Sequence, residues 1–310
     1  MKIGIVGMGA VGTATAMALM VRGRVSELTL VNRNRTRAKG VATDMRYGAP
    51  LSAPMTIADG DYGDLAGAAV VIVAAGVNEK AGGATDRGDA AGRLRLLGPN
   101  IKVYQEIVPP IVAAAPEAVI LVATDPPDPL VDVARRLANH ERVTGTGTYL
   151  DSLRFRVHLA QRLGVSPASV EAYVVGEHGT SSVFLWSLVR VGGRSIDKVA
   201  AERGVPYDEF RRAVEHEVRY ANISIIEGIG ASQYGIGVVT ARIAEVIAAD
   251  ERAIFPVGWH NDQFGTALSL PSVVGRGGVL EVLLPDMSDD EARALERSAE
   301  TLRNALTKYQ

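Results

Sequence analysis

The chain has 310 residues, of which 47% are hydrophobic and 22% are charged, and its formal net charge at pH 7 is −2. Such a composition is typical of a globular protein with one large or two moderate domains, and the small charge gives no electrostatic case for binding nucleic acid or an anionic membrane surface. The chain contains no cysteine, which excludes disulfides, thiolate metal sites and cysteine nucleophiles, and we expect no metal site.

The amino-terminal residues MKIGIVG run directly into a predicted strand and do not have the pattern of a secretory signal. Charges or glycines interrupt every apolar run before it reaches the length needed to cross a bilayer. We therefore expect a cytoplasmic protein with no membrane partner.

Four short apolar runs in the first half predict strands that are buried on both faces. They are residues 2–6, 28–31, 70–75 and 119–124. Helical patterns lie between them, including residues 10–23 and 100–115. Strands that alternate with helices in this way are typical of βαβ units, so we expect an α/β fold with a parallel sheet.

The second half mixes the two patterns. Residues 170–179 and 184–193 predict strands, 207–229 and 236–249 long helices, 268–285 a hairpin-like pair of strands, and 289–309 a terminal amphipathic helix. The pattern changes near Gly147. We therefore expect one domain over residues 1–147 and a second, mixed α+β domain over residues 148–310.

A glycine motif follows the first predicted strand, where Gly7, Gly9 and Gly12 have the spacing G-x-G-x-x-G. The first two glycines permit a tight turn and the close approach of a pyrophosphate, and the third lets helix and strand pack closely. A strand before the motif, a helix after it and a second strand ending about twenty residues on predict a dinucleotide site rather than a purely structural turn. The expected cofactor-binding residues are Gly7, Gly9, Ala10, Val11, Gly12, Asn32, Arg33, Gly76 and Thr124.

The end of the second strand bears on which dinucleotide binds. An acidic residue there would bind the ribose hydroxyls of NAD, but this chain has Asn32, followed by Arg33 and Arg35. Without the carboxylate a 2′-phosphate is not repelled, and a nearby guanidinium can pair with it. The other interpretation is that the arginines are solvated and Asn32 binds the ribose as a neutral group. We expect NAD, with NADP as the open alternative.

Three polar side chains in the second half have the chemistry needed to reduce a 2-keto acid. Asp151 and Arg154 share one face of a predicted helix, and His178 lies between glycines in VVGEHGTSS. An imidazolium can protonate the alkoxide that forms as hydride reaches the carbonyl carbon, and a carboxylate behind the ring fixes its tautomer. A guanidinium can bind the substrate carboxylate through two parallel hydrogen bonds. Taken alone, His178 is more often a structural side chain at a strand end.

Seven segments resemble, in the same order, those of the L-lactate/malate dehydrogenase family, and they are closer to the lactate type. They are KIGIVGMGAVG, ATDMRYGAP, VIVAAGVNEK, LVATDPPDPL, GTGTYLDSLRFR, VVGEHGTSS and LSLPSVVGRGGV. The resemblance implies a doubly wound Rossmann domain followed by a mixed substrate domain. It also implies hydride transfer between a nicotinamide cofactor and an L-2-hydroxy acid or 2-keto acid, and a homodimer or homotetramer.

The same resemblance implies roles for four residues. Asp151 and His178 would be the proton-transfer pair, Arg154 the clamp for the substrate carboxylate, and Ser232 a hydroxyl residue beside the substrate.

The family also has a loop arginine that polarises the substrate carbonyl when the loop closes. The loop at residues 81–93 of this chain is longer than usual by several residues. Counting back from Asn100 favours Arg93 for this role, whereas counting forward from Lys80 gives Arg87.

Three residues depart from the family pattern near the expected substrate. Glu79 stands where lactate-type members have Gln and malate-type members have Arg, Asp125 replaces an Asn, and Thr180 replaces an acidic or amide residue. Glu79 would repel the second carboxylate of oxaloacetate, unless it points to solvent, and an ionised Asp125 cannot donate a hydrogen bond to the reacting oxygen.

The two added carboxyls leave alternatives open. The substrate could carry an amino group, the enzyme could be a malate dehydrogenase, or the chain could be an inactive dinucleotide-binding sensor whose site Asp125 has spoiled. The related NAD-dependent glycosidases are longer and hold a metal partly through cysteine, so a chain without cysteine argues against them.

Overall fold

The computed structural model describes residues 1–82, 84–89 and 91–309. Gly83 and Ala90, which belong to the long loop expected at residues 81–93, and Gln310, the last residue of the expected second domain, lie outside the described residues. Within the described residues, no helix combines the length and the apolar composition that crossing a membrane requires.

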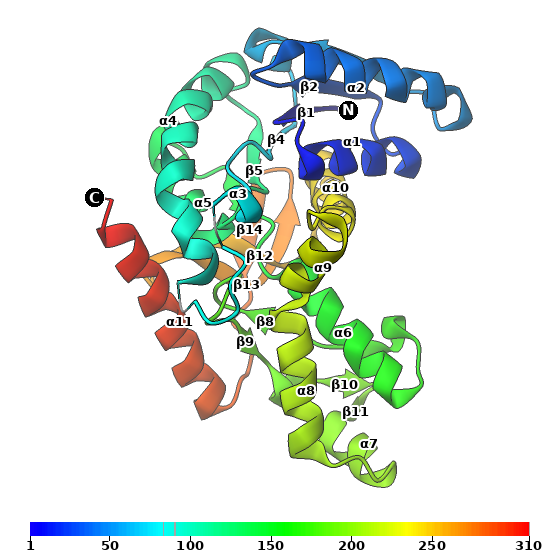
Figure 1. Ribbon diagram of the computed structural model, residues 1–310, viewed down its shortest axis with the longest axis vertical. Coiled ribbons are helices and arrows are strands. Elements are labelled where there is room, and N and C mark those ends of the chain that lie inside the picture. The colour runs from blue at the N-terminus through cyan, green and yellow to red at the C-terminus, as the bar shows by residue number, and fades with distance from the viewer. Residues whose placement is uncertain (83, 90, 310) are drawn as a thin grey trace.

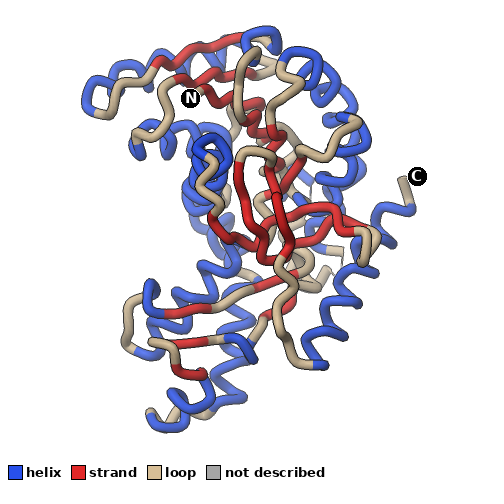
Figure 2. Tube along the Cα trace, turned by 180° about the vertical axis from the view of Figure 1, so that it is seen from behind, coloured by secondary structure: helices blue, strands red, loops and turns tan. Residues whose placement is uncertain are grey.

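One sheet forms the centre of the molecule (Figures 1 and 2). In the described part of the chain it has nine strands, in the order β14-β13-β12-β6-β5-β4-β1-β2-β3. The strands are β1 Lys2–Val6, β2 Glu27–Val31, β3 Thr56–Gly60, β4 Val70–Val73, β5 Val119–Val122, β6 Val143–Gly145, β12 Ala253–Asn261, β13 Thr266–Gly275 and β14 Gly278–Val282. The strands β1 to β6 pair in parallel, and their order reverses between β1 and β4. Ligands of such sheets bind at this switch point, beyond the carboxyl ends of the strands.

Three antiparallel strands continue the sheet beyond β6. Gly258 of β12 pairs with Gly145 of β6, and β13 and β14 follow as neighbouring strands. Strands from the last part of the chain therefore extend the sheet that the first part builds.

Helices cover both faces of the parallel part (Figure 1). The helices α1 (Ala10–Arg22), α2 (Arg35–Gly48) and α10 (Tyr234–Ala249) pack on one face, and α4 (Leu97–Ala114) and α5 (Pro127–Ala138) on the other, with α11 (Asp289–Thr307) beside α5. Successive residues of a strand point to opposite faces, so Ile5 joins the first core and Val6 the second. Burial on both faces explains why these strands are continuous apolar runs.

The remaining elements form a smaller unit in the lower part of Figure 1. They are α6 (Tyr149–Leu163), β7 (Val170–Glu171), β8 (Val174–Val175), β9 (Val183–Phe184), β10 (Arg190–Val191), β11 (Arg194–Ser195), α7 (Ile196–Glu202), α8 (Tyr207–Arg219) and α9 (Ala221–Ile229). The core of this unit contains an aromatic cluster, in which Phe155 and Trp186 pack edge to face with ring centroids 4.8 Å apart. The short helix α3 (Glu79–Gly82) and 3₁₀ turns at Ala49–Leu51, Tyr62–Leu65, Gly92–Leu96, Pro167–Ser169 and Trp186–Leu188 complete the chain.

The expected fold class, a doubly wound parallel sheet followed by a mixed second half, is confirmed. The prediction of a single helix over residues 207–229 is wrong, because α8 and α9 are separate helices that meet at Tyr220. The buried residues through which α8 packs on the aromatic core end just before Tyr220. Residues 170–179 and 184–193 contain strand pieces of only two residues, and in the second range a 3₁₀ turn at Trp186–Leu188 interrupts the strand and buries Trp186 in that core.

Candidate active site

Two adjoining cavities lie where the strand order reverses, and they share Gly9 and Gly76. The inner cavity has a volume of about 160 Å³ and the outer cavity about 650 Å³. Of the expected site residues, the inner cavity is lined by Gly9, Ala10, Val11, Gly76, Glu79, Arg93, Thr124, Asp125, Arg154, His178 and Ser232. The outer cavity is lined by Gly7, Gly9, Asn32, Arg33 and Gly76. Gly12 and Asp151 line neither cavity, but Gly12 packs against Gly7 and Asp151 hydrogen-bonds to His178, and both of these residues line a cavity.

The glycine loop has the shape that a dinucleotide requires. Gly7 has a φ of +104°, and a side chain there would meet the backbone nitrogen of Ala75 at 2.5 Å. A Cβ on Gly12 would lie 1.8 Å from the carbonyl oxygen of Gly7, which shows how closely α1 approaches the strand. A Cβ on Gly9 would meet nothing within 4 Å, because Gly9 faces the open cavities at the start of α1. This free space beside a helix amino-terminus fits the pyrophosphate of NAD.

Asn32 at the end of β2 fixes this loop. The backbone N–H of Met8 donates to Asn32 Oδ1 at 2.9 Å, and Asn32 Nδ2 donates to the carbonyl oxygen of Asn34 at 3.0 Å. Arg33 and Arg37 line the outer cavity near it, and Arg37 also donates to the carbonyl oxygen of Met8. This wall of the outer cavity is therefore neutral to cationic at Asn32, Arg33 and Arg37.

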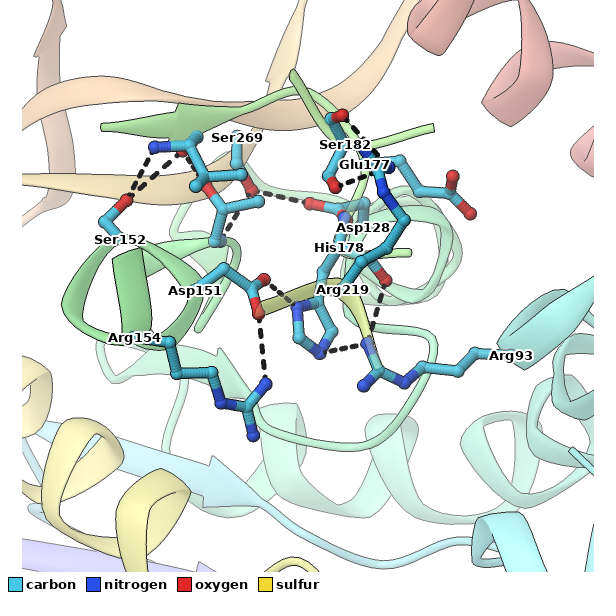
Figure 3. A network of polar contacts seen from close by, with 12 residues as sticks. Arg93, Asp128, Asp151, Ser152, Arg154, Glu177, His178, Ser182, Arg219 and Ser269 are labelled. Atoms are coloured by element: carbon cyan, nitrogen blue, oxygen red, sulfur yellow. Dashed lines mark hydrogen bonds and ion pairs between the residues drawn. The ribbon is translucent and has the colours of Figure 1, made fainter. Parts of the chain in front are cut away.

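Helix α6 brings two expected residues together on one face. Arg154 Nη1 donates to Asp151 Oδ1 at 3.1 Å, and the other oxygen of Asp151 forms a short hydrogen bond with His178 Nδ1 (Figure 3). Burial alone would raise the pKa of Asp151, but the charge and hydrogen bond of His178, together with Arg154, outweigh it and lower the pKa well below its ordinary range. Asp151 therefore stays ionised behind the imidazole.

Arg93 lies on the other side of the His178 ring (Figure 3). Its Nη1 is 2.6 Å from His178 Nε2, and because a guanidinium has no acceptor, Arg93 is the donor and Nε2 the acceptor. The ring proton is then on Nδ1, facing Asp151. Burial opposes the charge of Arg93, but the carboxylates of Asp125 and Asp151 outweigh burial and raise its pKa. The second candidate, Arg87, lies outside the inner cavity.

Arg87 pairs with helix α9 instead. Its guanidinium binds Glu227 at 2.6 and 2.9 Å and donates to the Ser224 hydroxyl at 3.2 Å. Of the two arginines suggested by counting, the structure thus places Arg93 beside His178 and Arg87 beside helix α9.

Asp128 holds His178 in place, although it was not among the site residues expected from the sequence. The backbone N–H of His178 donates to Asp128 Oδ2 at 2.7 Å, and the Ser269 hydroxyl donates to Asp128 Oδ1 at 2.9 Å. The side chain is 1% exposed. A second acidic residue three positions after Asp125, at the start of a helix, is the signal that could have identified it.

Asp128 is expected to make stability depend on pH. Burial raises its pKa to about 7 from an ordinary value of 3.8, against the hydrogen bond from His178. Between about pH 4 and 7 the folded state therefore holds one more proton than the unfolded state, so the free energy of unfolding falls as pH rises. Asp128→Asn, which can still accept the His178 N–H, should make this slope shallower by the contribution of one proton, while Glu79, whose pKa is also raised to about 7, keeps its own contribution. Urea unfolding at pH 5 and pH 7.5 measures it, and equal slopes in the two proteins would contradict the assignment.

Asn100 forms hydrogen bonds with both loops that carry Glu79 and Asp125, two of the departures from the family pattern. The backbone N–H of Val77 donates to Asn100 Oδ1 at 2.7 Å, and Asn100 Nδ2 donates to the carbonyl oxygen of Asp125 at 2.6 Å. Gly76 is required there, since a Cβ would lie 2.4 Å from Thr124 Cγ2. Glu79 and Asp125 consequently reach the same cavity from the ends of β4 and β5.

The remaining cavity wall comes from the second half. Ser232 lies there with Leu150, Asn222 and Ile236, of which the sequence analysis identified only Ser232. Thr180 does not line the inner cavity, and its carbonyl oxygen accepts from Arg219 Nη1 at 2.5 Å. Within residues 1–82, 84–89 and 91–309, no three or more acidic or histidine side chains are grouped so that they could hold a metal ion.

Comparisons with known proteins place this geometry in a family. Residues 1–145 match the family model "lactate/malate dehydrogenase, NAD binding domain", and residues 148–310 match "lactate/malate dehydrogenase, alpha/beta C-terminal domain". The L-lactate dehydrogenase of Thermus aquaticus is 45% identical, covering 98% of each chain, and that of Chloroherpeton thalassium is 43% identical, covering 99% of each. The crystal structure of MGS-M5, a lactate dehydrogenase enzyme from a Medee basin deep-sea metagenome library, is 30% identical with a TM-score of 0.90, covering 99% of this chain and 98% of that one. The chain therefore belongs to the lactate/malate dehydrogenase family.

Proposed function

We propose that the chain is an NAD-dependent L-lactate dehydrogenase, which transfers hydride between nicotinamide and an L-2-hydroxy acid or 2-keto acid. The observation that carries the proposal is the inner cavity, where His178, Arg93 and Arg154 meet beside the glycine loop. The names of the relatives, L-lactate dehydrogenases over nearly the full length, support it. They do not favour the malate, amino-bearing or inactive alternatives.

NAD, held by the glycine loop and the outer cavity, would supply the carbon that donates or accepts the hydride. The proton is handled by His178. With Nδ1 bonded to ionised Asp151, the ring presents Nε2 to the inner cavity, where its imidazolium form protonates the substrate oxygen during reduction. During oxidation the neutral ring accepts the same proton, and the Asp151 charge stabilises the imidazolium that results.

Two guanidinium groups would each bind a different negatively charged part of the substrate. Arg154, which is 12% exposed and oriented by Asp151, would bind the substrate carboxylate. Arg93 reaches the region of His178 Nε2, so it would stabilise the negative charge that develops on the carbonyl oxygen. Together these residues position a 2-keto acid and polarise its carbonyl without contributing a covalent step.

A substrate panel tests the proposal. Purified protein is assayed with NADH and NADPH against pyruvate, longer 2-keto acids, oxaloacetate and amino-bearing 2-keto acids. We expect the highest kcat/KM with NADH and a monocarboxylic 2-keto acid of the pyruvate type. Cofactor binding without turnover of any 2-keto acid would contradict the proposal in favour of a sensor, and preferred turnover of oxaloacetate would contradict the lactate assignment.

Because Asn32 is neutral and does not repel a 2′-phosphate, we expect the enzyme to discriminate only weakly between NADH and NADPH. Asn32→Asp places a carboxylate beside the position of a 2′-phosphate, and we expect kcat/KM with NADPH to fall roughly 10- to 100-fold relative to NADH, since close like charges repel by a few kcal/mol. Asn34→Asp adds the same charge at the cap of α2, outside the cavity lining, and serves as the matched control. Unchanged cofactor preference in Asn32→Asp would contradict the placement of the adenosine ribose.

We also propose that the chain acts in the cytoplasm as a homodimer or homotetramer. The neighbouring helices α1 and α10 expose large apolar side chains, with Val21 at 64% and Tyr234 at 67% exposure, together with Met17 and Val238. Apolar surface of this kind is typical of a contact between subunits. A solution mass of a single chain in sedimentation experiments would contradict the oligomer.

A further inference from the structure

Arg87 forms an ion pair between the long loop and helix α9. Its Nη1 donates to Glu227 Oε1 at 2.6 Å, and its Nη2 donates to Glu227 Oε2 at 2.9 Å and to the Ser224 hydroxyl at 3.2 Å. Two parallel hydrogen bonds to one carboxylate fix the direction of approach as well as the contact. Ser224 and Glu227 are three residues apart, so both acceptors lie on one exposed face of α9.

The buried side of α9 belongs to the wall of the inner cavity. Asn222, at the start of the helix, is buried and lines this cavity, and Ser232, just beyond its end, lines it as well. The ion pair of Arg87 therefore joins the long loop to a helix that the active site already uses.

The inner side of the same loop packs against the residues that handle the proton. Arg93 Nη1 is 2.6 Å from His178 Nε2 (Figure 3), and a Cβ on Gly92 would lie 3.2 Å from Thr180 Cγ2. A cavity lined by Gly92, Thr180 and Tyr220 has a volume of about 30 Å³, room for roughly one or two water molecules. The loop is thus closed over this side of the site.

Asp89 connects the two arginines of the loop. It lies two residues after Arg87, and its carboxylate binds partners on both sides of Arg93: the backbone N–H of Ala91 donates to Oδ1 at 3.0 Å, and Arg95 Nε donates to Oδ2. A loop that is bonded internally in this way moves as one piece. Holding Arg87 in place therefore also restrains Arg93.

The remaining contacts of the loop leave it easy to open. Among the described residues 84–89 and 91–95, Ala84 is the only buried apolar residue, and segments that bury little apolar surface open at a small cost in free energy. The side chains of Arg87 and Glu227 are 41% and 57% exposed, and an exposed ion pair adds little to the stability of a whole protein. Where the open and closed forms of a loop have similar free energies, however, the same pair changes their populations several-fold.

Resting on the function proposed above, we propose that Arg87 is a positioning residue, whose ion pair with Glu227 holds the long loop closed on α9 and so keeps Arg93 in front of His178. Arg87 does not line the inner cavity, so it acts through Arg93 and not on the substrate. When the pair is broken, the open form becomes more populated, and Arg93 spends less time beside the carbonyl oxygen.

Charge reversal tests the pair. In Arg87→Glu and in Glu227→Arg two like charges face each other, and we expect kcat/KM for pyruvate reduction to fall roughly 3- to 10-fold in each variant. The double variant restores opposite charges at the same positions and should return to within about twofold of wild type. The dissociation constant of NADH should not change, because neither residue lines the outer cavity.

Glu227→Arg separates the ion pair from a general effect of charge. This substitution adds positive charge near a site for an anionic substrate, so a change in the overall field alone would raise kcat/KM, whereas loss of the pair lowers it. The matched control is Arg194, whose Nη1 donates to Glu202 Oε2 at 2.9 Å in a pair that is similarly exposed and lines neither cavity. Arg194→Glu should leave kcat/KM within about twofold of wild type, since it breaks only a surface pair.

Hydrogen exchange of the protein without substrate measures loop closure independently of turnover. Peptides from the long loop should exchange roughly 3- to 10-fold faster in Arg87→Glu and in Glu227→Arg than in wild type, and the double variant should restore the slow exchange. A rise of kcat/KM in Glu227→Arg, no recovery in the double variant, or loop exchange that the single substitutions leave unchanged would overturn the proposal. If loop exchange responds as expected but the wild type turns over no 2-keto acid, the ion pair is supported, and the function on which the positioning role rests is overturned.

Discussion

Replacing His178 with Gln should lower kcat/KM for pyruvate reduction by about 10²–10⁴-fold, the range for losing a positioned general acid. Gln can occupy the same place and bond to Asp151, but it cannot carry the proton from Nε2 to the substrate oxygen. Because the proposed NAD site, the glycine loop and the outer cavity, does not include His178, the dissociation constant of NADH should change little. Steady-state kinetics and NADH fluorescence titration measure the two quantities.

The control for this variant is a second histidine in a similar contact. His260 Nδ1 is 2.6 Å from Asp132 Oδ1, and neither residue lines the inner cavity. His260→Gln therefore removes a histidine–aspartate contact without removing the proposed proton donor, and kcat/KM should stay within a few-fold of wild type. A His178→Gln enzyme with a rate close to that of the wild type would contradict the role of His178.

Replacing Arg154 with Lys should raise the KM for pyruvate and lower kcat/KM roughly 30- to 5,000-fold. This factor corresponds to a loss of about 2–5 kcal/mol of interaction free energy with the substrate carboxylate. Lys keeps the positive charge but not the planar fork that binds a carboxylate through two hydrogen bonds. Asp151 still needs a cationic neighbour, which Lys can supply, so the loss should lie mainly in substrate binding. Steady-state kinetics with pyruvate measures it.

Arg156 provides the matched control on the same helix. It lies outside the inner cavity, and its Nε donates to the carbonyl oxygen of Ala172 at 3.1 Å. Arg156→Lys makes the same chemical change on α6, and we expect kinetics within a few-fold of wild type. An unchanged KM in Arg154→Lys would place the substrate carboxylate elsewhere in the cavity.

Local sequence signals predicted the features that depend on local structure. The glycine loop could be identified because Gly7, Gly9 and Gly12 act within one turn and the helix that follows it. The parallel strands could be identified because burial on both faces makes them continuous apolar runs. Asp151 and Arg154 could be paired because three residues along a helix bring side chains to one face.

Contacts between distant parts of the chain could not be predicted in this way. The bond from His178 to Asp128 joins residues 50 positions apart, and no periodic pattern records it. Strand β12 was not predicted either: Pro256 interrupts its apolar run, and its pairing with β13 becomes evident only in the folded sheet. The choice between Arg93 and Arg87 depended on where the longer loop folds, which counting along the sequence left open.

The hydrogen bond from His178 to Asp128 affects which segments can be exchanged between related chains. Asp128 belongs to helix α5 in the segment that matches the NAD-binding model, whereas His178 belongs to the segment that matches the C-terminal model. Gly145 and Gly258 join the same two segments through one sheet pairing. The position of His178 relative to the glycine loop is therefore fixed by bonds that join the two segments, and neither segment alone contains all of them. A hybrid made from two relatives is therefore expected to keep this geometry only if both parents provide these contacts between the segments.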